Sequence, residues 1–205
     1  MSSALEPTSL ETWAHAYVSS TSLAFKLSPP PLPTSFAEAP SSLRVDRPGR
    51  PSELRVVWDK YKAPKSAHAL ASPLKRAHLL HTFLHHELQA AELMCWAVLS
   101  FPDTPPAFRR GLLSICMDEI RHMQMYSDHI ERLGYRVGDF PVRDWFWERT
   151  PHASTPAQFV SVMGLGFEAS NLDHTARFAA MFREAGDEEG ARLQEQVGEE
   201  EIAHV

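Results

Sequence analysis

The chain has few cysteines and no long apolar run, and these absences exclude several classes of protein. Its 205 residues include only two cysteines, Cys95 and Cys116, both in apolar stretches of helical character. Two separated thiols are too few for a disulfide framework or a four-cysteine metal site, so we expect reduced core thiols. No apolar run approaches the roughly 20 residues that span a bilayer, so no contact with a membrane is expected.

Positive charge is also scarce. A net charge of −6 and a pI near 6.0 argue against a general nucleic-acid binder, which depends on basic patches. The first residues include Glu6 and Glu11 and no apolar core, which indicates neither a secretory nor a transit peptide. We therefore expect a cytoplasmic protein with one packed domain and an appendage.

Proline, in contrast, is concentrated near the N-terminus. Residues 1–27 contain one short amphipathic stretch, with Leu10, Trp13 and Tyr17 at helical spacing. Seven prolines between residues 29 and 51 rule out a long helix in that part of the chain. We expect residues 1–71 to form this short helix and a Pro-rich extended arm that wraps the rest of the molecule or a partner.

Residues 72–205 have the pattern of an all-α domain. Ser72, Thr104 and Thr155 each place a capping hydroxyl before a proline, while Gly134 and Gly186 stand where helices are expected to stop. The predicted helices span 73–100, 105–133, 156–185 and 187 to the end. Two helical hairpins joined by a long crossover, residues 134–155, match a ferritin-like four-helix bundle.

A duplicated motif carries the chemistry of this domain. The two copies are Glu119-x-x-His122 and Glu201-x-x-His204. Glu87 precedes the first copy, and Glu168 precedes the second, by nearly the same number of residues. Four carboxylates and two imidazoles on four helices are the ligand set of a dinuclear metal site inside a helical bundle.

The phasing of the helices directs these acids inward. At about 100° per residue, Glu87 shares a face with Leu84 and Met94, and Glu119 shares one with Leu112. No lysine or arginine shares these faces, so we expect two divalent cations to balance the four carboxylates. Oxygen and nitrogen ligands of this mixture suit two Fe ions, with Mn as the alternative.

The second half of the site has weaker support. The residues facing Glu201 form a thin apolar stripe, and Glu200 also stands one turn before His204. We prefer Glu201 because its spacing to His204 repeats that of Glu119 and His122. The sequence ends one residue after His204, before such a helix is expected to end, so we expect it to be part of a longer protein.

Other polar residues fit simpler roles. Tyr126 lies on the face of Glu119 and is a candidate hydrogen-bonding or redox neighbour of the metals, although core packing explains it more simply. Glu92 points about 140° away from Glu87 and is expected in solvent. Five further histidines are expected on helix surfaces: His81, His85, His86, His129 and His174.

The block from His85 to His204 resembles the ferritin-like di-iron superfamily. Four phrases within it resemble domain-of-unknown-function family 455, a bacterial ferritin-like group without an assigned reaction. The phrases are His86-Glu87-Leu88-Gln89-Ala90, Phe108-Arg109-Arg110-Gly111-Leu112, Gly138-Asp139-Phe140-Pro141-Val142 and Glu200-Glu201-Ile202-Ala203-His204. The resemblance covers about residues 70–205.

The superfamily resemblance also implies roles for single residues. Glu87 and Glu168 would be terminal carboxylates, Glu119 and Glu201 would bridge the metals, and His122 and His204 would each bind one metal. It further implies that reduced iron reacts with dioxygen or peroxide to oxidise a bound organic molecule.

We therefore expect a dinuclear non-haem iron oxidoreductase, an oxygenase or hydroxylase that acts on a small-molecule substrate. The alternative is a ferroxidase or iron-handling protein without an organic substrate. Some related enzymes modify a transfer-RNA base, and the basic stretch from Arg44 to Lys65 suits RNA, but the acidity of the whole chain disfavours nucleic acid. A metal-free interaction module comes last.

Overall fold

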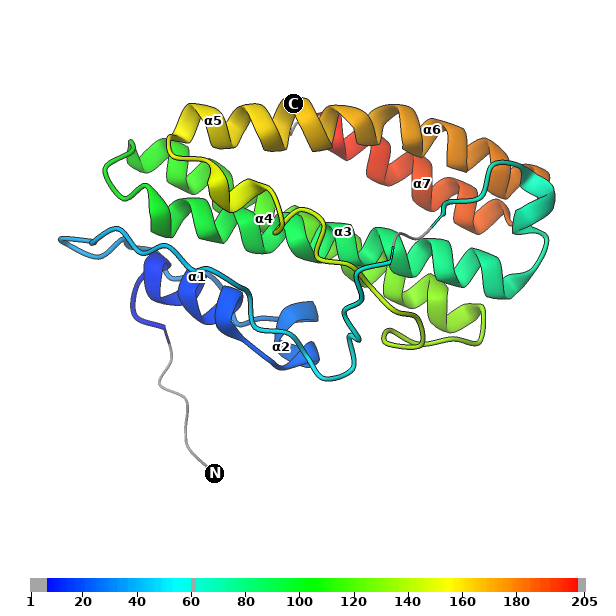
Figure 1. Ribbon diagram of the computed structural model, residues 1–205, viewed down its shortest axis with the longest axis horizontal. Coiled ribbons are helices and arrows are strands. Elements are labelled where there is room, and N and C mark those ends of the chain that lie inside the picture. The colour runs from blue at the N-terminus through cyan, green and yellow to red at the C-terminus, as the bar shows by residue number, and fades with distance from the viewer. Residues whose placement is uncertain (1–6, 60–61, 203–205) are drawn as a thin grey trace.

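A computed structural model describes residues 7–59 and 62–202, with the backbone alone for residues 165–173. The described residues are all-α, with no β-strand and a single parallel bridge between Val56 and Val142. Two helical hairpins form the body of the molecule (Figure 1). The first hairpin is α3 (Pro73–Ser100) and α4 (Pro106–Arg132), and the second is α6 (Ala169–Glu184) and α7 (Glu188–Glu201).

The third long helix is not uniform. A short helix, α5 (Pro156–Val160), continues into a π-helical segment, η3 (Ser161–Glu168), which continues directly into α6. The sequence predicts a single helix over 156–185, and these three segments occupy that range. π-helical turns are rare and occur frequently at functional sites. Here the π-helical segment ends at Glu168, one of the predicted ligands.

Two glycines end helices as the sequence predicts. Gly134 and Gly186 have φ values of 85° and 81°, a left-handed conformation that costs glycine little. At the first, the Tyr135 N–H donates to the carbonyl of Ile130 at 3.1 Å, which closes the end of α4. Gly134 therefore sets where the crossover segment begins, and Gly186 sets where the second hairpin turns.

Two of the three predicted helix starts after a capping hydroxyl are right, at Pro73 and Pro156, although the Ser72 hydroxyl makes no capping hydrogen bond, and the third start is wrong. Thr155 caps α5, and its hydroxyl accepts from the Gln158 N–H at 3.2 Å. Thr104 caps nothing, because α4 begins two residues later, at Pro106. A residue before proline avoids the α region, so Pro105 adopts ψ 140° and delays the helix.

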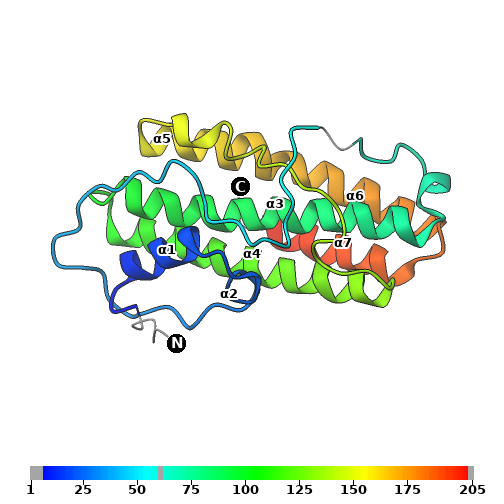
Figure 2. The same ribbon diagram turned by 60° about the horizontal axis from the view of Figure 1, so that its bottom comes forward.

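The N-terminal segment lies along the outside of the first hairpin. Two helices, α1 (Leu10–Ser19) and α2 (Leu23–Leu27), pack on α3 and α4, on the side opposite α6 (Figures 1 and 2). The extended arm that follows holds one 3-10 turn, η1 (Ala67–Leu70). It stays close to α3, since the Trp96 indole donates to the carbonyl of Val45 at 3.1 Å.

A buried ion pair anchors this arm, and it corrects the expectation that Glu92 is in solvent. Glu92 is fully buried and lies 2.8 Å from Lys26 Nζ and 2.5 Å from Arg50 Nη1. Its other oxygen accepts from the Trp147 indole at 2.8 Å. The sequence suggests exposure because Glu92 points away from Glu87, but the arm and the crossover cover that face.

The anchor extends through the crossover segment. Asp144 lies 2.9 Å from Arg50 Nη2 and 3.0 Å from His85 Nε2. Burial raises the pKa of Asp144, but hydrogen bonds from His85 and Arg50 outweigh it and lower the pKa to about 2. The pKa of Glu92 is likewise lowered, because Arg50 and Lys26 outweigh the opposing effect of burial. Both acids therefore stay ionised inside the protein.

Candidate metal centre

Four predicted ligands come together between three helices. Glu87 comes from α3, Glu119 and His122 come from α4, and Glu201 comes from the end of α7. One donor atom from each side chain lies within 4.8 Å of the others. All four side chains are buried, with Glu87 the most exposed at 4%. This group of four is called the acidic cluster below.

Helix geometry explains how these residues meet. Glu119 and His122 are one turn apart on α4, on a stripe that also buries Leu112, Cys116 and Met123. On α7 the stripe of Gln194 and Val197 leads to Glu201, and all three side chains are buried. The thin stripe noted in the sequence is therefore sufficient to turn Glu201 inward.

A close approach of α6 and α7 supports the position of Glu201. A Cβ atom added at Gly198 would lie 2.4 Å from Thr175 Oγ1, so a larger residue would push the helices apart. Glu201 stands one turn later on the same helix. The small size of Gly198 therefore positions the last ligand rather than adding flexibility.

His122 is held at both ring nitrogens. Its Nδ1 lies 3.4 Å from Glu119 Oε2 and 3.7 Å from Glu201 Oε1, inside the cluster. Its Nε2 lies 2.7 Å from Glu200 Oε2 on the outer side. Burial lowers the pKa of His122, but the carboxylates of Glu119, Glu200 and Glu201 outweigh it, so the pKa is raised.

Glu200 has a role that the sequence does not reveal. It orients His122 from outside the cluster, and Arg121 holds it there at 2.6 Å. Burial raises its pKa, but the hydrogen bonds from Arg121 and His122 lower the pKa to about 2. The sequence suggests Glu200 as an alternative ligand near His204. Its contact with His122 crosses from α7 to α4, so no spacing within one helix indicates it.

Tyr126 lies beside the cluster, one turn after His122 on α4. It is 1% exposed, and its hydroxyl accepts a hydrogen bond from Gln194 Nε2 at 3.4 Å. Burial raises the pKa of Tyr126 well above its usual value, and the charges of Glu87, Glu201 and Glu119 raise it further. The phenol therefore stays protonated within the field of the carboxylates.

Two predicted ligands fall outside the described side chains. The backbone of Glu168 ends η3, but its side chain is not among those described, and His204 lies beyond the last described residue. The structure thus brings together four of the six predicted ligands, gives only the backbone position of Glu168, and does not describe His204.

Three of the five further histidines are buried, against the expectation of surface positions. His81 accepts a hydrogen bond from the Gly138 N–H at 2.8 Å, His85 pairs with Asp144, and His129 lies 3.1 Å from Asp187. Loops pack over these faces of α3 and α4, which helix periodicity alone does not show. His174 is exposed, and His86 is half-buried.

The two cysteines are neighbours in the core of the first hairpin. Cys95 and Cys116 are fully buried with their sulfur atoms 3.5 Å apart. Burial raises the pKa of the Cys116 thiol well above its usual value, and Cys95 raises it further. Both are free core thiols, as the sequence predicts.

The donor set suits a metal ion. Three carboxylates and one imidazole in a buried space are ligands that iron and manganese bind readily. Three carboxylates that share one buried space favour a bound cation. The molecule is thus an all-α protein with a buried carboxylate–imidazole cluster between its hairpins.

Sequence comparison assigns the chain to a family. It belongs to the family described as Protein of unknown function (DUF455), whose profile matches residues 8–205. No curated protein and no solved structure matches the chain significantly. Among the described residues, no helix is long and apolar enough to cross a membrane.

Proposed function

We propose that this protein is a dinuclear non-haem iron oxidoreductase, an oxygenase or hydroxylase that acts on a small organic molecule. The observation that carries this proposal is the acidic cluster, whose four donor atoms lie within 4.8 Å of one another. The proposal includes a ferritin-like four-helix bundle made of α3, α4, the α5–η3–α6 segment and α7. Manganese is the alternative metal.

The proposed ligand set is larger than the described cluster. Glu87, Glu119, His122 and Glu201 would hold the metals from three helices. The duplication in the sequence adds Glu168, at the end of the π-helical segment, and His204. A wider helical turn at Glu168 supports this assignment, because π-helical turns occur frequently at functional sites.

Bound iron would supply the electrons that activate dioxygen, which no side chain of this protein provides. The protein's own groups prepare the site. Glu200 accepts a hydrogen bond from His122 Nε2, which turns Nδ1 of the same ring toward the cluster, where it would bind a metal after losing its proton. Arg121 fixes Glu200 in turn. The pair therefore orients the imidazole before any metal binds.

Tyr126 lies beside the acidic cluster and is hydrogen-bonded to Gln194. The phenol keeps its proton, and Gln194 fixes its oxygen. Both side chains are buried, so they also exclude water from the cluster. A protonated phenol in this position is a hydrogen-bond donor for a group that binds beside the metals.

An iron-binding experiment tests the proposal. The full-length protein is purified without oxygen and titrated with Fe(II), and bound iron is counted before oxygen is admitted. We expect about two irons per chain and a new near-ultraviolet and visible spectrum after oxygen. Glu119→Ala and Glu201→Ala should each lower the stoichiometry.

The matched controls are exposed acids on the same helices. Glu131→Ala on α4 and Glu199→Ala on α7 remove a carboxylate without touching the cluster and should bind iron as the parent does. Absence of binding in the parent, or equal binding in all variants, contradicts the proposal. Loading far beyond two irons per chain favours the alternative, iron handling without an organic substrate.

A further inference from the structure

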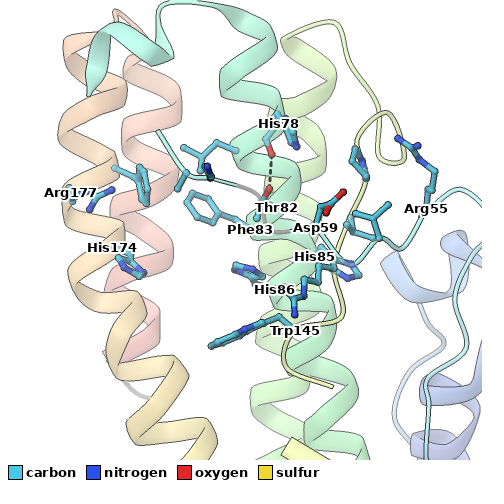
Figure 3. A pocket seen from close by; sticks show the side chains of 18 residues that line it. Arg55, Asp59, His78, Thr82, Phe83, His85, His86, Trp145, His174 and Arg177 are labelled. Atoms are coloured by element: carbon cyan, nitrogen blue, oxygen red, sulfur yellow. Dashed lines mark hydrogen bonds between the residues drawn. The ribbon is translucent and has the colours of Figure 1, made fainter. Parts of the chain in front are cut away.

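A cavity of about 720 Å³ lies beside the acidic cluster, between α3 and α6 (Figure 3). The arm and the crossover segment contribute the rest of its lining. Small-molecule sites in proteins usually measure about 300–1,000 Å³. The cavity therefore has the size of a site for one small organic molecule.

The rim of this cavity is positively charged. Arg55, Lys62 and Arg177 line it as exposed cations, and Asp59 is the one carboxylate among its described lining residues. Arg143 also lines it, but that guanidinium is balanced by Glu148 at 2.7 Å. The chain as a whole has a net charge of −6, so the positive charge at this rim is a local departure from the charge of the whole molecule. It attracts anions to this opening.

The interior is apolar and aromatic. Figure 3 shows Phe83 and His86 on α3 directed toward the space in front of α6, with Trp145 of the crossover beside them. Phe83 and Phe178 meet edge to face, with ring centroids 5.2 Å apart. Aromatic walls favour a flat, unsaturated ligand, which stacks on them at little entropic cost.

One aromatic layer separates the cavity from the cluster. The Phe83 ring lines the cavity, and its centroid lies 6.0 Å from that of Tyr126, beside the carboxylates. Glu87 stands one turn after Phe83 on α3, and its neighbour His86 lines the cavity. The cavity and the cluster therefore occupy adjacent faces of the same turns of α3.

We propose that this cavity binds a small organic anion, with an unsaturated body inside and a carboxylate, sulfonate or phosphate at the cationic rim. The identification of this anion as the substrate rests on the proposed function, whereas its binding does not. Arg177 is the principal anchor of the anionic group. Its guanidinium carbon lies 4.8 Å from the centroid of the Phe178 ring, at the junction of rim and interior.

Two dyes of the same shape test this binding. 8-Anilinonaphthalene-1-sulfonate carries an anionic group on an aromatic body, and N-phenyl-1-naphthylamine has that body without the sulfonate. Fluorescence titration of the full-length protein should give one saturable site that prefers the sulfonate. Arg177→Gln should weaken sulfonate binding about threefold, the size of one exposed charge pair, and leave the neutral dye unaffected.

Arg192→Gln is the matched control, since Arg192 is an exposed arginine on α7 outside the cavity. It should bind both dyes as the parent does. Equal affinity of the parent for the two dyes, or equal effects of Arg177→Gln and Arg192→Gln, overturns the proposal. Binding of many dye molecules per chain also overturns it, because it indicates nonspecific apolar surface.

The metal-binding proposal and the anion-binding proposal can be contradicted independently of each other. Arg177→Gln should bind iron normally, and Glu119→Ala should retain the preference for the sulfonate. If the parent binds iron but shows no such preference, the substrate class is wrong and the metal proposal stands. If the preference is present but iron does not bind, the cavity remains a ligand site and the oxidoreductase proposal falls.

Discussion

Helix α3 buries two carboxylates, Glu87 and Glu92, in different surroundings. Glu92 faces the N-terminal arm, where Lys26 and Arg50 supply positive charge from within the chain. Glu87 belongs to the acidic cluster, whose other members are two carboxylates and an imidazole. The two acids are less than two turns apart on opposite sides of one helix.

The difference separates a structural role from a chemical one. A buried ion is tolerated when an opposite charge accompanies it, and a tethered lysine supplies that charge permanently. Under the proposed function, the acidic cluster would instead take its positive charge from metal ions in solution, so its state would depend on metal. The arm side of α3 therefore provides fixed attachment, whereas the cluster side is where the proposed function would place exchange with a metal.

The largest expected effect is on the arm side. Glu92→Gln leaves Lys26 buried without its counter-charge and should destabilise the protein by about 3–5 kcal/mol. Urea unfolding measures this, with Glu131→Gln, an exposed acid on α4, as a control expected within about 0.5 kcal/mol of the parent. A cost below about 1 kcal/mol would mean that the ion pair does not anchor the arm.

A Glu→Gln substitution in the acidic cluster should change stability in a different way from Glu92→Gln. Glu119→Gln removes a charge from among like charges, so the metal-free variant should be at least as stable as the metal-free parent. It should instead lose most of the stabilisation by Fe(II) or Mn(II), which reaches about 2.7 kcal/mol at 100 times the dissociation constant.

Thermal unfolding under argon, with and without metal, measures this difference. Glu119→Gln and Glu92→Gln are compared in the same series, with Glu131→Gln as the common control. If Glu119→Gln destabilises the metal-free protein as strongly as Glu92→Gln does, the cluster is structural. The contrast between the two sides of α3 would then be lost.

Much of the cluster side was predictable because it depends on local regularity. The spacing of Glu119 and His122 sets them on one face of a helix, and the apolar residues around them mark that face as buried. Gly134 and Gly186 stop helices through their own backbone preference. These signals lie within a few residues of the features that they predict.

The arm side was not predictable, because its contacts join distant parts of the chain. The sequence around Glu92 has the pattern of a solvent-exposed helix position. The residues that bury it, Lys26 and Arg50, are 66 and 42 residues away in the sequence. Glu200 acts on His122 across 78 residues. Helix periodicity carries no information about contacts between distant segments. It therefore predicts that Glu92 is exposed to solvent, whereas tertiary packing places Lys26 and Arg50 against it.

A smaller effect should appear at Asp144, which links Arg50 to His85. Its folded-state pKa of about 2 is below its ordinary value of 3.8, so it stabilises the fold above about pH 4. This stabilisation, about 2 kcal/mol, is lost as the pH falls toward 2. Asp144→Asn should therefore be less stable than the parent at pH 6, and the difference should disappear near pH 2. Urea unfolding across this range measures it, and a difference independent of pH would exclude the ion pair as its cause.

The smallest expected effect isolates a single hydrogen bond from an uncharged donor to Glu92. Trp147→Phe removes the indole N–H that donates to Glu92 Oε2 at 2.8 Å and keeps most of the aromatic packing. Because Lys26 and Arg50 still balance the charge, the cost should be about 1–2 kcal/mol, well below that of Glu92→Gln. Urea unfolding of the two single variants and their combination gives the coupling between the side chains. If the two free-energy costs are additive, the indole stabilises the protein by packing alone. If they are strongly coupled, the hydrogen bond from Trp147 in the crossover segment directly stabilises the buried Glu92 carboxylate.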